Sequence, residues 1–325
     1  MSGCPVIVFS RLSDNGRFLL HRYDASGVHV IGGREGDCIA PVFSPDGTQV
    51  LFSRQHGQGV GLELLTLGQE CSRTLTRGPF CDFSPAWATD GRRIAFCRGP
   101  RMELASANDI ELYAAELPQV EPRRLTENRR FDAYPCFAGP DRILFESGDK
   151  DDFFGVFSLS WHGGEETPLA YAPDEYGVGI PHVHGQVATA ELCEIATPDV
   201  YDIIRLNLDA PHTMLRIALP GSRGGNPSPR FSHAGDAVAC YAWRDGAGSL
   251  VLVDTATQRL REIQPQGMSL KLPRWSRDDR YLCCEETRSG GLALIEAASG
   301  DAQLVPDSQG YRTQRFGELY NFDIF

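Results

Sequence analysis

Residues 40–54 of the chain read APVFSPDGTQVLFSR. The stretch predicts a short apolar strand, a Pro-Asp-Gly turn at residues 45–47, and a second apolar strand over residues 50–52. Proline presets φ for a turn, aspartate can bond its own backbone, and glycine takes a positive φ without a Cβ clash. The stretch therefore predicts two antiparallel strands that are joined by a tight turn.

The same unit recurs along the chain. Residues 84–98 read SPAWATDGRRIAFCR, looser copies begin at Tyr134, Ser228 and Leu272, and a degenerate copy, IPHVHGQVATAE, begins at Ile180. One proline aligns in all six copies: Pro41, Pro85, Pro135, Pro181, Pro229 and Pro273. By subtraction, their spacings are 44, 50, 46, 48 and 44 residues. A period of this length with several strand signals per repeat is typical of a β-propeller.

The ends of the chain predict how such a propeller would close. Each repeat carries four strand signals, enough for one four-stranded antiparallel blade, and residues 1–36 resemble a blade without its innermost strand. Residues 311–325 carry alternating aromatics and are expected to supply that strand. With repeats starting near 40, 84, 134, 180, 228 and 272, the sequence predicts one all-β domain over residues 1–325. We expect a seven-bladed propeller, with six blades plus extensions as the alternative; closure removes free sheet edges.

Composition excludes some classes of protein. The net charge of −12 and the pI near 5.1 argue against binding to nucleic acid or to an anionic membrane surface, which both need surplus Lys and Arg. No apolar run approaches the roughly 20 residues that span a bilayer. The N-terminus MSGCPVIVFSR lacks a signal-peptide pattern, and the 10 Cys form no C-x-x-C pair. Reduced, buried thiols and a cytoplasmic location are therefore expected.

The repeat P-x-[FW]-S-P-D-G-x-x-[IV]-x-F, seen at Pro41–Phe52 and nearly so at Pro85–Phe96, resembles the TolB-like propeller repeat. The resemblance extends through all six repeats and is weakest at Pro181. The family includes periplasmic partner-binding proteins, propeller domains of serine peptidases and, more distantly, sugar-acid lyases similar to oligogalacturonate lyase. This chain has no G-x-S-x-G motif of a hydrolase. The resemblance implies a fold and leaves the activity open.

The Pro181 repeat departs from the others by carrying His182 and His184. Side chains at i and i+2 of a strand project to the same face, and Gln186 follows at i+4. The two imidazoles and Gln186 are candidate ligands for a divalent metal, and the His pair is a candidate general acid or base. The alternative is a His pair that bonds the backbone and packs between blades. No other cofactor is indicated.

Arginines occupy two sets of equivalent positions. Arg230 and Arg274 follow the aligned prolines, as His182 does, whereas Arg11, Arg54 and Arg98 end second strands. Arginine can hold a carboxylate with two bonds, so a small anion is the expected ligand of such a cluster. The alternative is that the arginines pair with nearby acids: Asp82, Asp132, Glu285 and Glu286.

Two further features are weaker candidates. Trp243 ends a strand in a variable loop, where it could stack on a ligand or cap a blade. The acidic run at Asp149–Asp152 fits either a calcium site or a solvated loop.

Two functions stay open. The first is a propeller that binds a small anion or a protein partner at the mouth of the central channel. The second is a lyase for a carboxylate-bearing substrate, with His182 and His184 holding metal or moving protons. In that enzyme Arg230 and Arg274 would stabilise the developing enolate charge.

Overall fold

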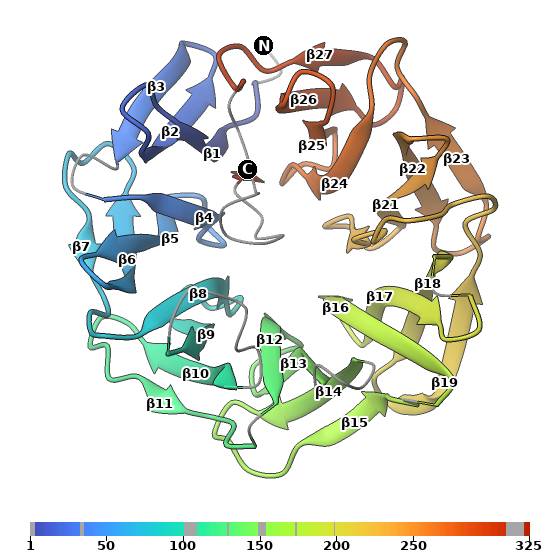
Figure 1. Cartoon of the computed structure of the whole chain (residues 1–325), viewed down its shortest axis with the longest axis horizontal. Coiled ribbons are helices and arrows are strands. Elements are labelled where there is room, and N and C mark those ends of the chain that lie inside the picture. Colours follow the sequence, from blue (N-terminus) through green and yellow to red (C-terminus); the bar gives the residue numbers. More distant parts are fainter. Residues whose placement is uncertain are drawn as a thin grey trace. The chain divides into compact units, whose positions relative to one another are not determined.

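The computed structural model describes residues 4–32, 36–100, 109–128, 130–148, 154–172, 174–197, 199–309 and 322–325 of the chain. Within these residues all regular structure is β-strand, without an α-helix (Figure 1). Among them, no helix is long and apolar enough to cross a membrane. The all-β prediction is therefore confirmed for the described part of the chain.

The residues group into two compact units. Unit 1 comprises Met1–Ile143, Ser160–Gly164 and Pro306–Phe325, and unit 2 comprises Leu144–Leu159 and Glu165–Val305. The run at Asp149–Asp152 lies outside the described residues, so its expected loop or calcium site is not placed.

Unit 1 contains one sheet of four strands and one of eight, and both are built from groups of four antiparallel strands, here called quartets. The first has the order β28 (Phe322–Ile324), β1 (Ile7–Leu12), β2 (Phe18–Asp24), β3 (Gly27–Gly32). The second has eight strands in two antiparallel quartets, linked by a parallel pairing of Val60 with Cys81. Its strands are β4 (Cys38–Phe43), β5 (Gln49–His56), β6 (Gly59–Thr66), β7 (Arg73–Thr74), β8 (Cys81–Trp87), β9 (Arg93–Gly99), β10 (Glu111–Glu116) and β11 (Arg123–Arg124).

The remaining sheets have four strands each, in chain order. One, with residues in both units, consists of β12 (Phe131–Phe137), β13 (Arg142–Gly148), β14 (Gly155–Ser160) and β15 (Thr167–Ala170). Unit 2 adds β16 (Tyr176–His184), β17 (Val187–Glu194), β18 (Tyr201–Asn207) and β19 (Ala210–Ile217). It also contains β20 (Arg230–Phe231), β21 (Ala237–Arg244), β22 (Ala247–Asp254) and β23 (Leu260–Ile263). Its last sheet is β24 (Leu270–Trp275), β25 (Tyr281–Glu286), β26 (Gly291–Glu296) and β27 (Ala302–Leu304).

The C-terminal strand completes the first sheet. β28 pairs antiparallel with β1, with Ile324 opposite Ile7 and Phe322 opposite Phe9. The backbone groups of Val6 and Phe325 also exchange two hydrogen bonds, of 3.0 and 2.8 Å. The expected pairing of the tail with the first strand is therefore present over Phe322–Ile324, whereas residues 310–321 lie outside the described residues.

The Pro-Asp-Gly turn forms as its residues predict. The Asp46 carboxylate accepts hydrogen bonds from the Ser44 hydroxyl (2.6 Å) and from the Thr48 amide (3.1 Å). Gly47 has φ of +71°, and a Cβ there would lie 2.4 Å from the Phe325 ring. Both the backbone conformation and the space therefore require glycine.

The aligned prolines mark a repeated break in the innermost strands. The residue before each proline has a positive φ although it is not glycine: Ala40, Ser84, Tyr134, Ile180, Ser228 and Leu272, between 44° and 54°. Strand register shifts at this point in β4, β8, β16 and β24. Such a bulge re-aims the side chains that follow it. The residue after the proline therefore occupies an equivalent place in each repeat.

Apolar side chains from neighbouring strands form the core of each unit. In unit 1, Val8, Leu20, Phe43 and Phe52 are buried together, with Phe325 packed against them. In unit 2, one cluster joins residues of β21 and β22 to residues of β24, β25 and β26. The core thus lies between the faces of consecutive sheets.

Candidate functional site

Three consecutive innermost strands of unit 2 carry the polar residues that follow the aligned prolines. They are His182 on β16, Arg230 on β20 and Arg274 on β24. Arg230 is 5% exposed, and His182 and Arg274 are half-buried. Basic side chains at the same step of successive repeats therefore share one region of unit 2.

Burial and neighbouring charge act together on His182. Burial lowers its pKa well below 6.5, and the charges of Arg230, Arg274, His233 and His184 lower it further, in that order. Desolvation and nearby positive charge both disfavour the protonated imidazole. His182 is therefore neutral at pH 7. We call these five residues the His–Arg cluster.

The two histidines of β16 share one face of the strand. The ring centroids of His182 and His184 lie 6.2 and 6.0 Å from that of Phe231. His182 Nδ1 accepts a hydrogen bond of 3.1 Å from the Phe231 amide. His184 is exposed, and a Cβ on Gly235 would lie 2.3 Å from its ring. The pair thus bonds the backbone and packs on the next repeat, as the alternative interpretation expects.

The same hydrogen bond bears on metal binding. Because Nδ1 of the neutral ring accepts the Phe231 proton, the ring's own proton is on Nε2 and no lone pair is left for a metal. Gln186 lies in the exposed turn after β16, where its backbone oxygen accepts from the Leu208 amide at 2.9 Å. Within the described residues, no three His, Cys, Asp or Glu gather to hold a metal. A metal at His182, His184 and Gln186 stays a prediction that this arrangement does not favour.

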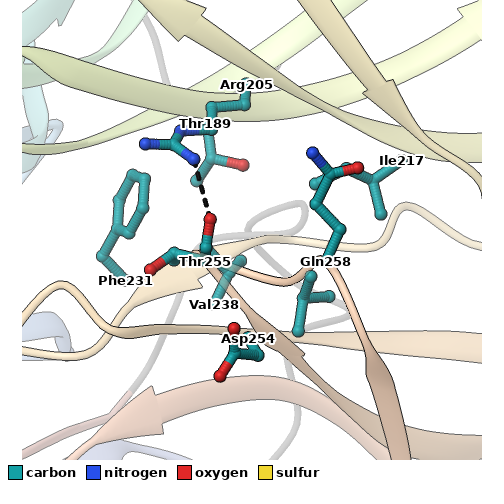
Figure 2. Close-up of a pocket in the computed structure, with 9 residues that line it drawn as sticks. Thr189, Arg205, Ile217, Phe231, Val238, Asp254, Thr255 and Gln258 are labelled. Carbon is teal, nitrogen blue, oxygen red and sulfur yellow. Dashed lines mark hydrogen bonds between the residues drawn. The ribbon is translucent and has the colours of Figure 1, made fainter.

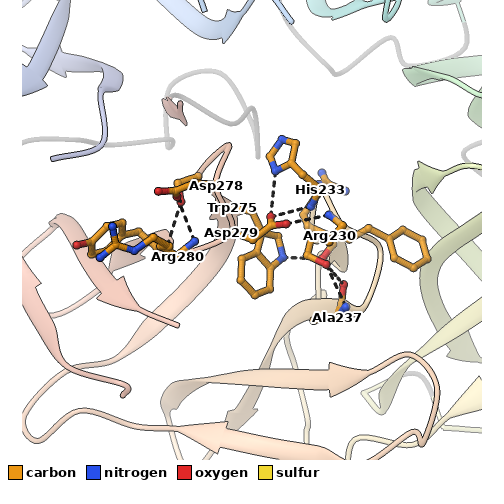
Figure 3. A network of polar contacts seen from close by, with 12 residues as sticks. Arg230, His233, Ala237, Trp275, Asp278, Asp279 and Arg280 are labelled. Atoms are coloured by element: carbon orange, nitrogen blue, oxygen red, sulfur yellow. Dashed lines mark hydrogen bonds and ion pairs between the residues drawn. The ribbon is translucent and has the colours of Figure 1, made fainter. Parts of the chain in front are cut away.

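A second network joins the turns that follow β20 and β24 (Figure 3). Asp279 accepts hydrogen bonds from the amides of His233 (2.7 Å) and Ala234 (2.8 Å), and its Oδ1 lies 3.1 Å from His233 Nδ1. Trp275 Nε1 donates to the Arg230 carbonyl at 3.0 Å. The network ties together the two repeats that carry Arg230 and Arg274. Sequence reasoning missed His233, which stands where the first repeat has the turn proline.

The other predicted arginines belong to unit 1 and have acidic or backbone partners. Arg98 Nε and Nη2 donate to the two carboxylate oxygens of Asp82, at 2.6 and 2.9 Å, and its guanidinium stacks 3.6 Å above the Phe80 ring. Arg54 Nη1 lies 3.4 Å from the buried Glu63 carboxylate. Arg11 Nη1 donates to the Asp307 carbonyl at 2.8 Å. Arg98 therefore pairs with one of the acids named from the sequence, as the alternative interpretation of the arginines expects.

The other acids named from the sequence also have partners in the structure. Asp132 accepts from the Asn128 side chain at 2.8 Å, Lys271 Nζ lies 3.4 Å from Glu285, and Glu286 accepts the Ser269 amide at 3.0 Å. Burial raises the pKa of Asp82, and the Arg98 and Thr76 hydrogen bonds oppose that rise. Each of these contacts lies within one sheet or in the segment next to its strands.

Trp243 is half-buried at the end of β21. Its amide donates to Ser222 Oγ at 3.1 Å, and its carbonyl accepts from the Arg223 amide at 2.8 Å. Its side chain packs close to Gly225 and Gly248. These contacts match the capping interpretation, and they do not bring Trp243 to the His–Arg cluster.

Two buried carboxylates were missed by sequence reasoning. Glu146 accepts the amide proton of Ile180 at 2.8 Å, and Glu191 accepts that of Ser228 at 3.0 Å. Ile180 and Ser228 are the left-handed residues of the bulge in the following repeat. Each Glu thus fixes the turn of backbone that aims the next basic side chain. The sequence does carry a signal for them: Glu146 and Glu191 stand at the step of the repeat where the first two copies have Ser53 and Cys97.

A small pocket in unit 2 lies near the cluster (Figure 2). It is lined by Thr189 and Arg205 from one sheet and by Phe231, Thr255 and Gln258 from the next repeat. Arg205 Nη1 donates to the Thr255 carbonyl at 2.9 Å across it. The space suits a water-sized molecule and is too small for a sugar-sized ligand.

Comparisons with known proteins bear on the fold. No protein-family model and no curated protein matches the sequence. An oligogalacturonate lyase in complex with manganese matches with a TM-score of 0.72 and 11% identity, over 93% of this chain and 86% of that one. TolB from Acinetobacter baumannii matches with a TM-score of 0.57 and 14% identity. An oligogalacturonate lyase from Vibrio parahaemolyticus matches with a TM-score of 0.68 and 9% identity, over 88% and 90%.

The chain has a TolB-like propeller fold. The resemblance seen in the sequence repeat is thereby confirmed at the level of the fold. The match to TolB covers 94% of this chain but only 64% of the length of TolB. At these identities the matches speak for the fold alone, and the function has to be argued from the residues of this chain.

Proposed function

We propose that this propeller is a binding protein for a small carboxylate-bearing anion, which it takes at the His–Arg cluster. The observation that carries the proposal is that His182, Arg230 and Arg274 occupy the same step of three successive repeats, of which the last two are tied together by the contacts of His233 with Asp279 and of Trp275 with Arg230. In a chain of net charge −12, such a cluster would focus positive potential on one small region. Two guanidinium groups suit a carboxylate because each can donate two parallel bonds.

Binding of D-galacturonate, with D-galactose as the uncharged match, tests this proposal by calorimetry. We expect saturable binding of galacturonate alone. Arg230→Gln or Arg274→Gln should weaken it at least tenfold, since each removes a charge-assisted contact. The matched control is Arg259→Gln, at an exposed arginine of the same unit. Equal binding of galactose, or full affinity in both cluster variants, would remove the proposal.

A lyase acting on a carboxylate-bearing sugar is the second candidate. Within the cluster, the imidazole of His184 is exposed and packs on Phe231 as His182 does, which offers a base in the same region as the arginines. His182 is poorly suited to that role, because its Nδ1 lone pair already accepts from Phe231. Formation of an unsaturated product from oligogalacturonate, followed by its absorbance, would support the enzyme if His184→Ala abolished it. Turnover that survives His184→Ala would exclude this residue as the base.

We also infer seven blades and a cytoplasmic location. Five four-stranded sheets and the two quartets of the eight-stranded sheet give seven strand quartets in the described part of the chain, which supports seven blades over six. All ten cysteines are free thiols, which suits a reducing compartment. An experimental structure with six radial sheets would contradict the first inference, and export of the tagged protein would contradict the second.

A further inference from the structure

The outer strand of the first sheet, β3, differs from the other outer strands. It is the last strand in the order β28-β1-β2-β3, so one of its edges faces no described strand (Figure 1). The expectation that closure removes free sheet edges is therefore wrong for the outer edge of this strand. Its six residues, Gly27–Gly32, read GVHVIG, without an acidic residue, lysine, arginine or proline. Val30 is 51% exposed, more than any other large hydrophobic residue in the described part of the chain. The strand thus offers unpaired backbone groups beside an exposed apolar side chain.

The other outer strands carry features that blunt an edge. β7 and β11 have two residues each and include arginine, and β27 has three. β23 contains an Arg-Glu pair, whereas β15 and β19 contain proline. Short length, charge and proline are the usual means by which edges avoid pairing with another chain. Of the outer strands described, β3 alone lacks all three.

We propose that β3 pairs antiparallel with β3 of a second copy of this chain. The segment Val28-His29-Val30 reads the same in both directions, so a two-fold axis at His29 would set Val28 opposite the second copy's Val30. Two β-branched residues in such a pair stabilise a sheet. The strand carries no formal charge, so the pairing would place no like charges opposite one another despite the net charge of −12. Such an interface is isologous and closes as a dimer.

Sedimentation velocity of the full chain over a range of concentrations tests the dimer. We expect the dimer fraction to rise with concentration and with added salt, because salt screens the repulsion between two chains of net charge −12. Val30→Lys should weaken the dimer at least tenfold, and Val30→Thr should retain it. The matched control is Leu304→Lys, at an exposed leucine of the three-residue outer strand β27. A monomer at all concentrations, or a dimer that withstands Val30→Lys, would overturn the proposal.

Cross-linking tests the register. With the axis at His29, a His29→Cys variant places two sulfurs directly opposite each other, at the separation a disulfide needs. In a Val30→Cys variant the two sulfurs are diagonal neighbours, too far apart to join. Both variants are made with Cys71→Ser, because Cys71 is the one exposed native thiol. A covalent dimer of His29→Cys alone supports the pairing, and efficient cross-linking of Val30→Cys instead would contradict this register.

Discussion

The two units use one backbone plan with different side chains. In both, the residue before an aligned proline is left-handed, and the strand register shifts at this point. The residues after the proline are Val42, Ala86 and Cys136 in unit 1, but His182, Arg230 and Arg274 in unit 2. A propeller repeat fixes where a side chain points, and the identity of that side chain decides whether the position packs or binds. The comparison therefore locates the candidate site in unit 2.

The residue that faces the bulge differs in the same way. Ser53 and Cys97 stand opposite Ile39 and Phe83 in unit 1, whereas Glu191 stands opposite Gly179 in unit 2. Within the described residues the buried Ser53 hydroxyl has no hydrogen-bond partner, whereas Glu191 receives the Ser228 amide. In unit 2, carboxylates therefore hold the bulges at Ile180 and Ser228, and these hydrogen bonds fix the backbone that precedes His182 and Arg230.

The largest expected effect separates the arginines of the two units. Arg98→Met should cost about 3–5 kcal/mol of unfolding free energy, because it leaves the buried Asp82 carboxylate without its bidentate partner. It should leave galacturonate affinity unchanged, since Arg98 is committed to Asp82. Chemical denaturation and calorimetry measure the two quantities. An Arg98→Met protein that keeps its stability and loses the ligand would break the comparison.

The carboxylate beneath the cluster should matter more than the hydroxyl at the matching step of unit 1. Glu191→Ala should cost about 1–3 kcal/mol, because the buried Ser228 amide loses its acceptor. Ser53→Ala should stay within about 0.5 kcal/mol, since its hydroxyl has no described partner. Urea denaturation of both variants measures the difference. Equal losses would show that the two positions are not equivalent.

His182 should make the free energy of unfolding depend on pH. Its folded pKa lies below 6.5, so the unfolded chain binds the proton first and stability falls as pH drops from about 6.5 towards the lowered value. The slope from this one group is at most about 1.4 kcal/mol per pH unit. His182→Asn keeps an acceptor for the Phe231 amide and should remove this part of the slope. Denaturation of both proteins from about pH 7.5 to about pH 5 tests it; identical slopes would contradict the lowered pKa.

The smallest effect concerns two tryptophans at matching positions. Trp275→Phe loses the indole hydrogen bond to the Arg230 carbonyl and should cost about 1 kcal/mol more than Trp87→Phe. The Trp87 indole nitrogen is buried without a hydrogen-bond partner in the described residues, so its loss removes no bond. Thermal unfolding of the two variants measures the difference in lost stability. A larger loss in Trp87→Phe than in Trp275→Phe would contradict the role given to the Trp275 hydrogen bond.

Much of the fold could be predicted because it depends on short sequence patterns that recur in each repeat. The Pro-Asp-Gly turns, the aligned prolines and the repeat length gave the four-stranded sheets, and the aromatic tail indicated the strand that pairs with β1. The same alignment puts His182, Arg230 and Arg274 at equivalent positions of three successive repeats. Repetition makes these positions equivalent whatever residue occupies them.

The partners of the side chains could not be predicted in the same way. The pairing of Arg98 with Asp82 depends on which of several acids lies within reach, and the sequence leaves that choice open. The contact of His233 with Asp279 joins two turns 46 residues apart, and neither turn signals it alone. The placing of Gln186 in the turn after β16 depends on a tight hairpin that replaces the longer consensus turn.

The pairing of β28 with β1 has a consequence for biosynthesis. The first sheet receives its innermost strand from residues that follow β1 by almost the whole length of the 325-residue chain. During translation, one edge of β1 therefore stays without its partner strand until the later repeats have been synthesised. A chaperone that covers Ile7–Leu12 during this interval would keep β1 from pairing with other nascent chains.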